Sequence, residues 1–213
     1  MTRSSVRAVL FDWDGTLADT SESSFRCYVR MFADLGISFD RDTFARTYSP
    51  NWHHTYRCVG LPEHRWTEAD EKWINYFAEE TTALIDGARE VLETLARCDV
   101  IRGIVTSGTR RRILAELASL EIDHHFTHIV CGDDGHRRKP DPEPLSICLD
   151  QLRVPTNEAA YIGDSAEDVM MARGAGVLCV GVRGPYPNHD GLLAAAPDFM
   201  ADSLAQAIDH LVR

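Results

Sequence analysis

Two aspartates, Asp12 and Asp14, stand two positions apart in the segment Asp12-Trp13-Asp14-Gly15-Thr16. The segment follows an apolar run, residues 6–11, whose only polar member is Arg7. Such a run predicts a strand that is buried on both faces, and ligand sites of open α/β sheets lie where strands end. Because burial of two unpaired anions is costly, the pair indicates a cation or a base nearby. The alternative is a simple turn, since Asp and Gly are common turn formers.

Polar groups also follow three later apolar runs. They are Thr106-Ser107-Gly108 after 101–105, Lys139-Pro140 after 129–131 and a short basic loop, and Gly163-Asp164-Ser165 with Asp168 after 159–162. The whole set is far more specific than any one of its members. We therefore interpret the ends of these runs as parts of one site.

From Gly87 onward, strand-like apolar runs alternate with helical patterns, which predicts βαβ units and a parallel sheet. The candidate strands cover residues 7–11, 102–106, 128–131, 160–163 and 178–182. The candidate helices cover 88–97, 110–120, 142–152, 166–173 and 203–211. The fold class predicted for this chain is α/β.

Residues 20–85 break this alternation. They lack a convincing strand and show helical periodicity over 25–35 and 69–84, with a loop-rich middle near Ser49-Pro50 and Gly60-Leu61-Pro62. We predict a helical insert after the first strand. Residues 1–19 and 86–213 would then form the α/β core, and residues 20–85 the insert.

The four polar groups together resemble the motifs of the haloacid dehalogenase-like (HAD) hydrolases: DxDGT, a Thr or Ser after the second strand, a Lys, and GDxxxD. All four occur in the family order, and the resemblance covers essentially the whole chain. It implies a Rossmann-like parallel sheet with a small helical cap that closes over the active site. The chain is most similar to the phosphoglycolate phosphatase and β-phosphoglucomutase-like branch.

The resemblance assigns chemistry to the acidic residues. It makes Asp12 the nucleophile that forms an aspartyl-phosphate, and Asp14 the general acid and base. Dehalogenases and phosphonatases of the superfamily lack an acid at the second position, so Asp14 favours phosphate-ester chemistry. The metal ligands implied are Asp12, Asp14, Asp164 and Asp168, and their oxygen atoms favour Mg²⁺. Asp168 could instead hold a metal-bound water or Lys139.

Phosphate binding is assigned to the second and third motifs. Thr106 is expected to bond a phosphoryl oxygen, with Ser107 and Gly108 offering amides at the start of a helix, although a Thr or Ser here could be a simple N-cap. Ser107 could take the role of Thr106 if the strand ends one residue later. Lys139 would offset negative charge, and the resemblance implies a cis bond between Lys139 and Pro140.

The insert carries an aromatic and basic cluster that we take as the source of substrate specificity. Its candidate substrate-binding residues are His53 and Arg57, and the wider group expected to face Asp12 also includes Trp52, His54 and Arg65. Ordinary surface or core histidines are the simpler interpretation. A His-His pair without a carboxylate or Cys at ligand spacing is weak evidence for a transition metal.

Composition limits the possible partners and location. With 22 basic and 33 acidic residues the formal net charge is −11, which argues against nonspecific binding to nucleic acid or an anionic membrane. The six cysteines form no C-x-x-C pair, and the first apolar run is too short for a signal peptide. We expect a cytoplasmic monomer or homodimer with reduced thiols, acting on a small phosphorylated metabolite.

The function predicted from the sequence is a Mg²⁺-dependent phosphatase that hydrolyses a small phosphate monoester. A phosphomutase of the β-phosphoglucomutase type would use the same four motifs. A protein that only binds phosphate or a partner is the alternative from a different class. The filled catalytic positions favour an enzyme.

Overall fold

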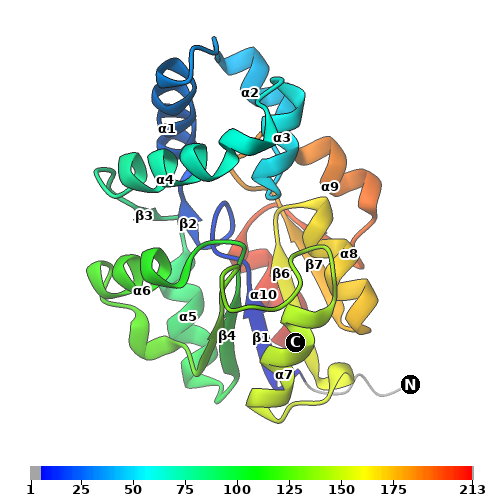
Figure 1. Ribbon diagram of the computed structural model, residues 1–213. Helices are drawn as coiled ribbons and strands as arrows, with labels where there is room; N and C mark the ends of the chain where they lie inside the picture. The colour runs from blue at the N-terminus through cyan, green and yellow to red at the C-terminus, as the bar shows by residue number, and fades with distance from the viewer. Residues whose placement is uncertain (1–5, 213) are drawn as a thin grey trace.

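The computed structural model describes residues 6–212, which form a six-stranded sheet with helices on both faces and a group of helices above one edge (Figure 1). The strand order is β5-β4-β1-β6-β7-β8, and every pair is parallel. The strands are β1 (Ala8–Phe11), β4 (Ile101–Val105), β5 (His128–Val130), β6 (Ala159–Gly163), β7 (Leu178–Val182) and β8 (Phe199–Ala201).

The first strand lies at the centre of the sheet. Phe11 is in register with Ile104 of β4 on one side and with Ile162 of β6 on the other. The residues that follow these three strands therefore emerge next to one another. The chain builds β4 and β5 on one side of β1 and then β6, β7 and β8 on the other, which makes this edge a topological switch point.

Alternate side chains of β1 enter two separate cores. Val9 and Phe11 pack in a cluster with α5 (Ala88–Arg97), α6 (Arg110–Ser119) and α10 (Leu204–Val212). Ala8 and Leu10 pack in another with α7 (Glu143–Leu152), α8 (Ala166–Ala175) and α9 (His189–Ala195). A strand alternates its side chains between two faces, so the continuous apolar run of β1 reflects burial on both sides.

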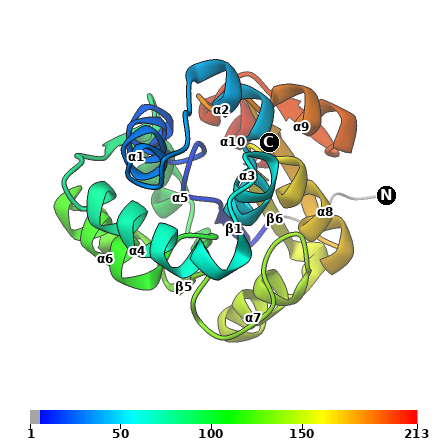
Figure 2. The same cartoon turned by 45° about the horizontal axis from the view of Figure 1, so that its top comes forward.

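The helices α1 (Ser21–Asp34), α2 (Arg41–Thr47), α3 (Trp52–Cys58) and α4 (Trp66–Phe77) gather above the carboxyl ends of the strands, where Figure 2 looks down on them. We call this group the cap. Its core is aromatic and includes Tyr28, Phe32 and Tyr56, together with Tyr186 from the loop before α9. Apolar burial of these rings stabilises the cap against that loop.

Two corrections concern the insert. No strand is predicted within the insert, but β3 (Ala83–Leu84) lies there. It pairs antiparallel with β2 (Ala18–Asp19), which precedes the insert, because the two chain connections to the cap run side by side. The helix predicted over 69–84 ends at Phe77, so the last of those residues form β3 and its approach. A strand of two residues is too short to show an alternating pattern.

The five predicted strands and five predicted core helices are present, with bounds that differ by no more than two residues. The prediction missed α2, α3 and α9, each seven residues long, and the three-residue β8. Elements this short complete too few turns or alternations to give a periodic signal. Over residues 6–212, no helix combines the length and apolar character that a membrane crossing requires.

Candidate active site

Three side chains that follow neighbouring strands meet at the switch point: Asp12 after β1, Thr106 after β4 and Asp164 after β6. All three are buried. The amide of Asp12 donates to the carbonyl of Ile162 at 2.9 Å, and that of Thr106 to the carbonyl of Val130 at 3.0 Å. These bonds extend the sheet pairing by one residue and fix the positions of the side chains beyond it.

Lys139 reaches this group from the loop after β5. Its Nζ donates to Asp12 Oδ1 at 2.6 Å, to Asp168 Oδ1 at 2.7 Å and to the Tyr161 hydroxyl at 2.7 Å. Burial by itself would lower the pKa of Lys139, but the carboxylates of Asp12 and Asp168 outweigh it and hold that pKa above its usual value. The Lys139-Pro140 peptide bond is cis, as the resemblance implied.

Asp168 is held by several donors. Its Oδ1 accepts from Lys139 at 2.7 Å, and the Tyr161 hydroxyl lies 3.0 Å away, with its single proton shared between Asp168 and the Val105 carbonyl. Its Oδ2 accepts from the amide of Ser165 at 3.1 Å and from the Ser165 hydroxyl at 2.6 Å, in a capping box that begins α8. Asp168 thus contacts and orients Lys139, which is one of the roles expected for it.

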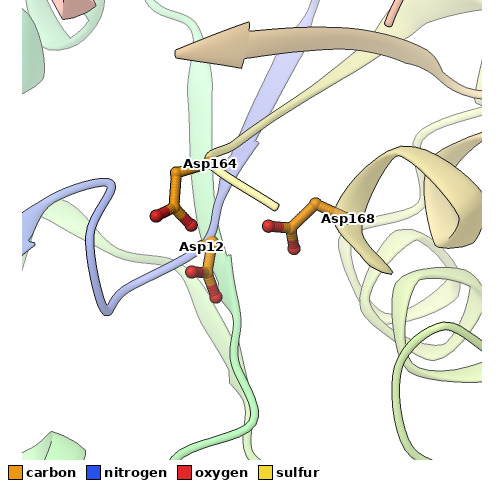
Figure 3. A group of neighbouring side chains, drawn as sticks. All are labelled: Asp12, Asp164 and Asp168. Atoms are coloured by element: carbon orange, nitrogen blue, oxygen red, sulfur yellow. The ribbon is translucent and has the colours of Figure 1, made fainter. Parts of the chain in front are cut away.

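The carboxylates of Asp12, Asp164 and Asp168 form a buried cluster in which one oxygen of each lies within 4.8 Å of the others (Figure 3). Desolvation raises the pKa of Asp12 to about 7, although Lys139 opposes the shift. Desolvation and the charges of Asp12 and Asp168 raise the pKa of Asp164 well above its usual range. Buried anions so close together favour binding of a cation, and hard carboxylate oxygens suit a divalent one. Asp12, Asp164 and Asp168 are the side chains that could hold it, and Asp12 and Asp164 each accept fewer hydrogen bonds than Asp168.

Gly15 allows this cluster to form. Its φ is +86°, and a Cβ at this position would lie 2.3 Å from Asp164 Oδ2. Only glycine adopts such a backbone conformation without strain, and only glycine leaves room for the carboxylate. The Asp-Gly step in the first motif thus serves the site as well as the turn.

Asp14 is not a member of the carboxylate cluster. Arg112, in the first turn of α6, donates to it through Nη1 at 2.9 Å and Nη2 at 2.5 Å, and the Thr20 hydroxyl donates at 2.8 Å. Burial would raise the pKa of Asp14, but Arg112 and Thr20 together lower it. The role of Asp14 as a metal ligand stays a prediction, and these contacts engage its carboxylate with Arg112 and Thr20 instead.

Sequence reasoning missed Arg112. The guanidinium also contacts Glu116 at 3.3 Å, and Glu116 accepts from the indole Nε1 of Trp13 at 2.5 Å. The available signal was the spacing of Arg112 and Glu116, which is that of an ion pair on one helix face. Its partner Asp14, 98 positions away, could not be read from that spacing.

Thr106, Ser107 and Gly108 line the same cavity, just before α6. The Thr106 hydroxyl accepts from the amide of Gly108 at 3.0 Å, so its own proton is free to be donated to a ligand. The Gly108 amide is correspondingly engaged within the loop. Of the two amides expected to bind phosphate, the Ser107 N–H is the one that this hydrogen bond leaves available.

The cavity between sheet edge and cap has a volume of about 290 Å³. It reaches from Asp12, Lys139 and Asp168 to a cap wall that is mainly aromatic. The cap residues of this wall include the aromatic Tyr28, Tyr48, Trp52, Tyr56 and Trp73, together with Ser24, Ser49, Pro50, Asp70 and Ile74.

His53 and Arg57 lie outside the lining of this cavity. The ring of His53 stacks on Trp66 at 4.5 Å, and the Arg57 guanidinium lies 5.1 Å from the centroid of the same ring. The phase of α3 explains this placement, because Trp52 and Tyr56, also four residues apart, occupy the helix face that meets the cavity. The short helix thus presents its aromatic face, rather than its basic face, to the site.

The other two basic residues of that group also lie outside the cavity lining. Arg65 pairs with Glu68 at 3.0 Å, and His54 is exposed beside Cys58. Several lining residues of the cap were not suggested by the sequence, among them Asp70 of α4. Its position between Trp66 and Trp73 on one amphipathic helix was the only signal available.

A parallel sheet with this cluster at its switch point, under a helical cap, defines the class of protein. The family model described as haloacid dehalogenase-like hydrolase matches residues 9–182. The chain belongs to that family, and it is an enzyme of the hydrolase class.

Individual relatives agree with this assignment. A pyrophosphatase, PpaX, of Bacillus velezensis is 29% identical over 215 residues, which cover 98% of this chain and 97% of the relative. A phosphoglycolate phosphatase of Yersinia pestis is 28% identical over 203 residues, covering 91% and 88%. The crystal structure of CbbY from Rhodobacter sphaeroides in complex with phosphate superposes with a TM-score of 0.77 at 27% identity, covering 94% of this chain and 96% of that one.

Proposed function

We propose that this protein is a Mg²⁺-dependent phosphatase that hydrolyses a small phosphate monoester through an aspartyl-phosphate on Asp12. The observation that carries the proposal is the convergence on Asp12 of a buried lysine and a second free carboxylate, Asp164, at the floor of a cavity. The names of the relatives, pyrophosphatase and phosphoglycolate phosphatase, support phosphate chemistry.

Asp12 is the nucleophile in this account. Its Oδ1 is held by Lys139 at 2.6 Å, which leaves Oδ2 to attack phosphorus. A carboxylate repels a phosphate dianion, and the Lys139 ammonium offsets that repulsion on one side. Mg²⁺ bound by Asp12 and Asp164 would supply the remaining positive charge on the other.

Thr106 and Ser107 hold the phosphoryl oxygens opposite Lys139. The free hydroxyl proton of Thr106 and the backbone N–H of Ser107 precede the N-terminus of α6, where unpaired amides attract anions. Donors fixed on the scaffold before the substrate arrives stabilise the developing charge without having to reorganise. Asp168 acts through Lys139 as a positioning residue.

Asp14 moves protons. In the first step, attack by Asp12 breaks the ester P–O bond and the leaving oxygen takes a proton from Asp14. In the second step, a water attacks the phosphoryl group and gives its proton back to Asp14, releasing phosphate and Asp12. The contacts with Arg112 and Thr20 favour ionised Asp14, which is the form that the second step requires. The first step requires Asp14 to leave these contacts and to carry the proton that the second step delivers.

The test is hydrolysis of p-nitrophenyl phosphate and acetyl phosphate by the purified protein. We expect turnover that EDTA abolishes and added Mg²⁺ restores. Activity that survives EDTA would refute the metal requirement, and failure to turn over any ester with Mg²⁺ would indicate a binding protein. Dependence on glucose 1,6-bisphosphate would mark a phosphomutase.

A further inference from the structure

The cap wall of the cavity contains a carboxylate among aromatic rings. Asp70 of α4 lines the cavity beside Trp52, Tyr56 and Trp73. Its Oδ1 accepts from the Trp52 indole Nε1 at 2.9 Å and from the Tyr56 hydroxyl at 2.9 Å. Both donors are neutral, so they fix the carboxylate in place without balancing its charge.

No Lys or Arg of residues 6–212 forms an ion pair with Asp70. The basic group found closest to it is His53, whose Nε2 lies 3.8 Å from Asp70 Oδ2. Burial lowers the pKa of His53, and the charge of Arg138 lowers it further. Asp70 opposes this shift, but the pKa of His53 remains below its usual value. This shift favours the neutral ring of His53, and no Lys or Arg of the described residues is paired with the Asp70 carboxylate.

Two of the three cations that line the cavity are paired with carboxylates. Lys139 is bonded to Asp12 and Asp168, and Arg112 to Asp14. The third, Arg138, is exposed, and its guanidinium lies 4.4 Å from the Trp52 ring centroid. The part of a substrate that extends from phosphorus toward α4 thus meets aromatic rings and the Asp70 carboxylate, with Arg138 beside Trp52.

On the basis of the proposed function, we propose that the leaving group of the substrate is an alcohol that carries a positively charged nitrogen, bound by Asp70 and the aromatic wall. Aromatic faces attract an ammonium group, most strongly where water is excluded. The carboxylate complements the same charge and opposes a second carboxylate. The cavity volume of about 290 Å³ suits a small amino-alcohol ester rather than a nucleotide.

The proposed substrate differs from phosphoglycolate, after which one of the relatives is named. If phosphoglycolate extended its carboxylate toward α4, that carboxylate and the Asp70 carboxylate would repel each other. The indole Nε1 of Trp73, which is buried and has no hydrogen-bond partner, is a neutral donor and cannot balance that charge. The esters that fit the wall are therefore ammonium-bearing ones.

The test compares esters that differ only in charge. Phosphocholine is paired with 3,3-dimethylbutyl phosphate, in which carbon replaces the nitrogen, and phosphoethanolamine with propyl phosphate. We expect kcat/KM for each ammonium ester to exceed that of its neutral partner by about tenfold or more, which cation–π attraction and the carboxylate can supply together. Phosphoglycolate should be a poorer substrate than either ammonium ester.

The variant Asp70→Asn removes the charge but keeps an oxygen that can accept from Trp52 and Tyr56. We expect it to lower kcat/KM for the ammonium esters about tenfold more than for their neutral partners. Glu71→Gln is the matched control, since it removes one charge from an exposed neighbouring position of α4 and should keep the wild-type preference. A loss that is equal for charged and neutral esters would mean a merely structural role for Asp70.

The two proposals fail in different ways. If the wild-type protein hydrolyses neither acetyl phosphate nor p-nitrophenyl phosphate with Mg²⁺, the proposed phosphatase function is wrong. If it hydrolyses these esters but treats ammonium and neutral partners alike, or prefers phosphoglycolate, the assignment of the leaving group is overturned and the phosphatase function stands.

Discussion

Replacement of Arg112 by Met tests how much the ion pair between Arg112 and Asp14 of the first motif contributes to stability. The Arg112 side chain is 14% exposed and contacts two carboxylates, Asp14 at 2.5 Å and Glu116 at 3.3 Å. Loss of one partner from a buried pair costs about 3–5 kcal/mol, because a charge is left buried and uncompensated. Asp14 is 23% exposed, so we expect the lower end of that range, about 3 kcal/mol.

Urea unfolding measures this loss. With a slope of about 2–3 kcal/mol per molar urea, a loss of about 3 kcal/mol lowers the midpoint by about 1 M or more. The control is Arg111→Met, which makes the same chemical change at the adjacent, exposed position of α6 and should shift the midpoint little. Met retains much of the apolar stem of arginine, which limits the loss of packing.

A double-mutant cycle identifies the partner. If Arg112 acts through Asp14, the double variant Arg112→Met with Asp14→Asn should be less destabilised than the sum of the single variants. Equal stability of the Arg112 and Arg111 variants would refute the reasoning. Additive effects in the cycle would remove Asp14 as the partner.

Two further predictions concern the carboxylate cluster. Asp164→Ala should raise the Mg²⁺ concentration needed for half-maximal activity by more than about tenfold, because loss even of residues that only support metal ligands costs about that much. Glu167→Ala should change it little, since the Glu167 side chain accepts from Ser49 in the loop between α2 and α3. Equal shifts in a Mg²⁺ titration would contradict the assignment. Gly15→Ala should reduce activity severely, because the new Cβ would lie 2.3 Å from Asp164 Oδ2. Gly36 has a similar φ of +76° but open space around it, so Gly36→Ala should lose only about 1–3 kcal/mol of stability through backbone strain and should keep its activity. Comparable activity in the two glycine variants would show that the close approach is unimportant.

The floor of the site was largely predictable because its positions are set by the sheet. Strands buried on both faces give continuous apolar runs, and parallel strands end at one edge, so Asp12, Thr106 and Asp164 could be expected to lie together. The burial of Lys139 between two carboxylates required the loop after β5 to fold back, and the resemblance rather than periodicity indicated it.

The cap wall was not predictable to the same degree. Which face of α3 meets the cavity depends on how aromatic residues such as Trp66 pack, and a seven-residue helix gives no clear phase. The ion pair of Arg112 and the position of Asp70 likewise arise from tertiary contacts between segments distant in the chain. Local pattern carries no information about such pairings, so only the structure reveals them.

The most direct test of the account is chemical trapping of the phosphorylated residue during turnover. The protein is mixed with acetyl phosphate and Mg²⁺, quenched in acid and treated with borohydride, which reduces an aspartyl-phosphate to homoserine, and the peptides are analysed by mass spectrometry. We expect homoserine at position 12 and nowhere else, and neither label nor turnover in Asp12→Asn, in which the attacking anion is lost at nearly unchanged volume. Turnover by Asp12→Asn, or label at another carboxylate, would contradict the assignment of Asp12 as the nucleophile.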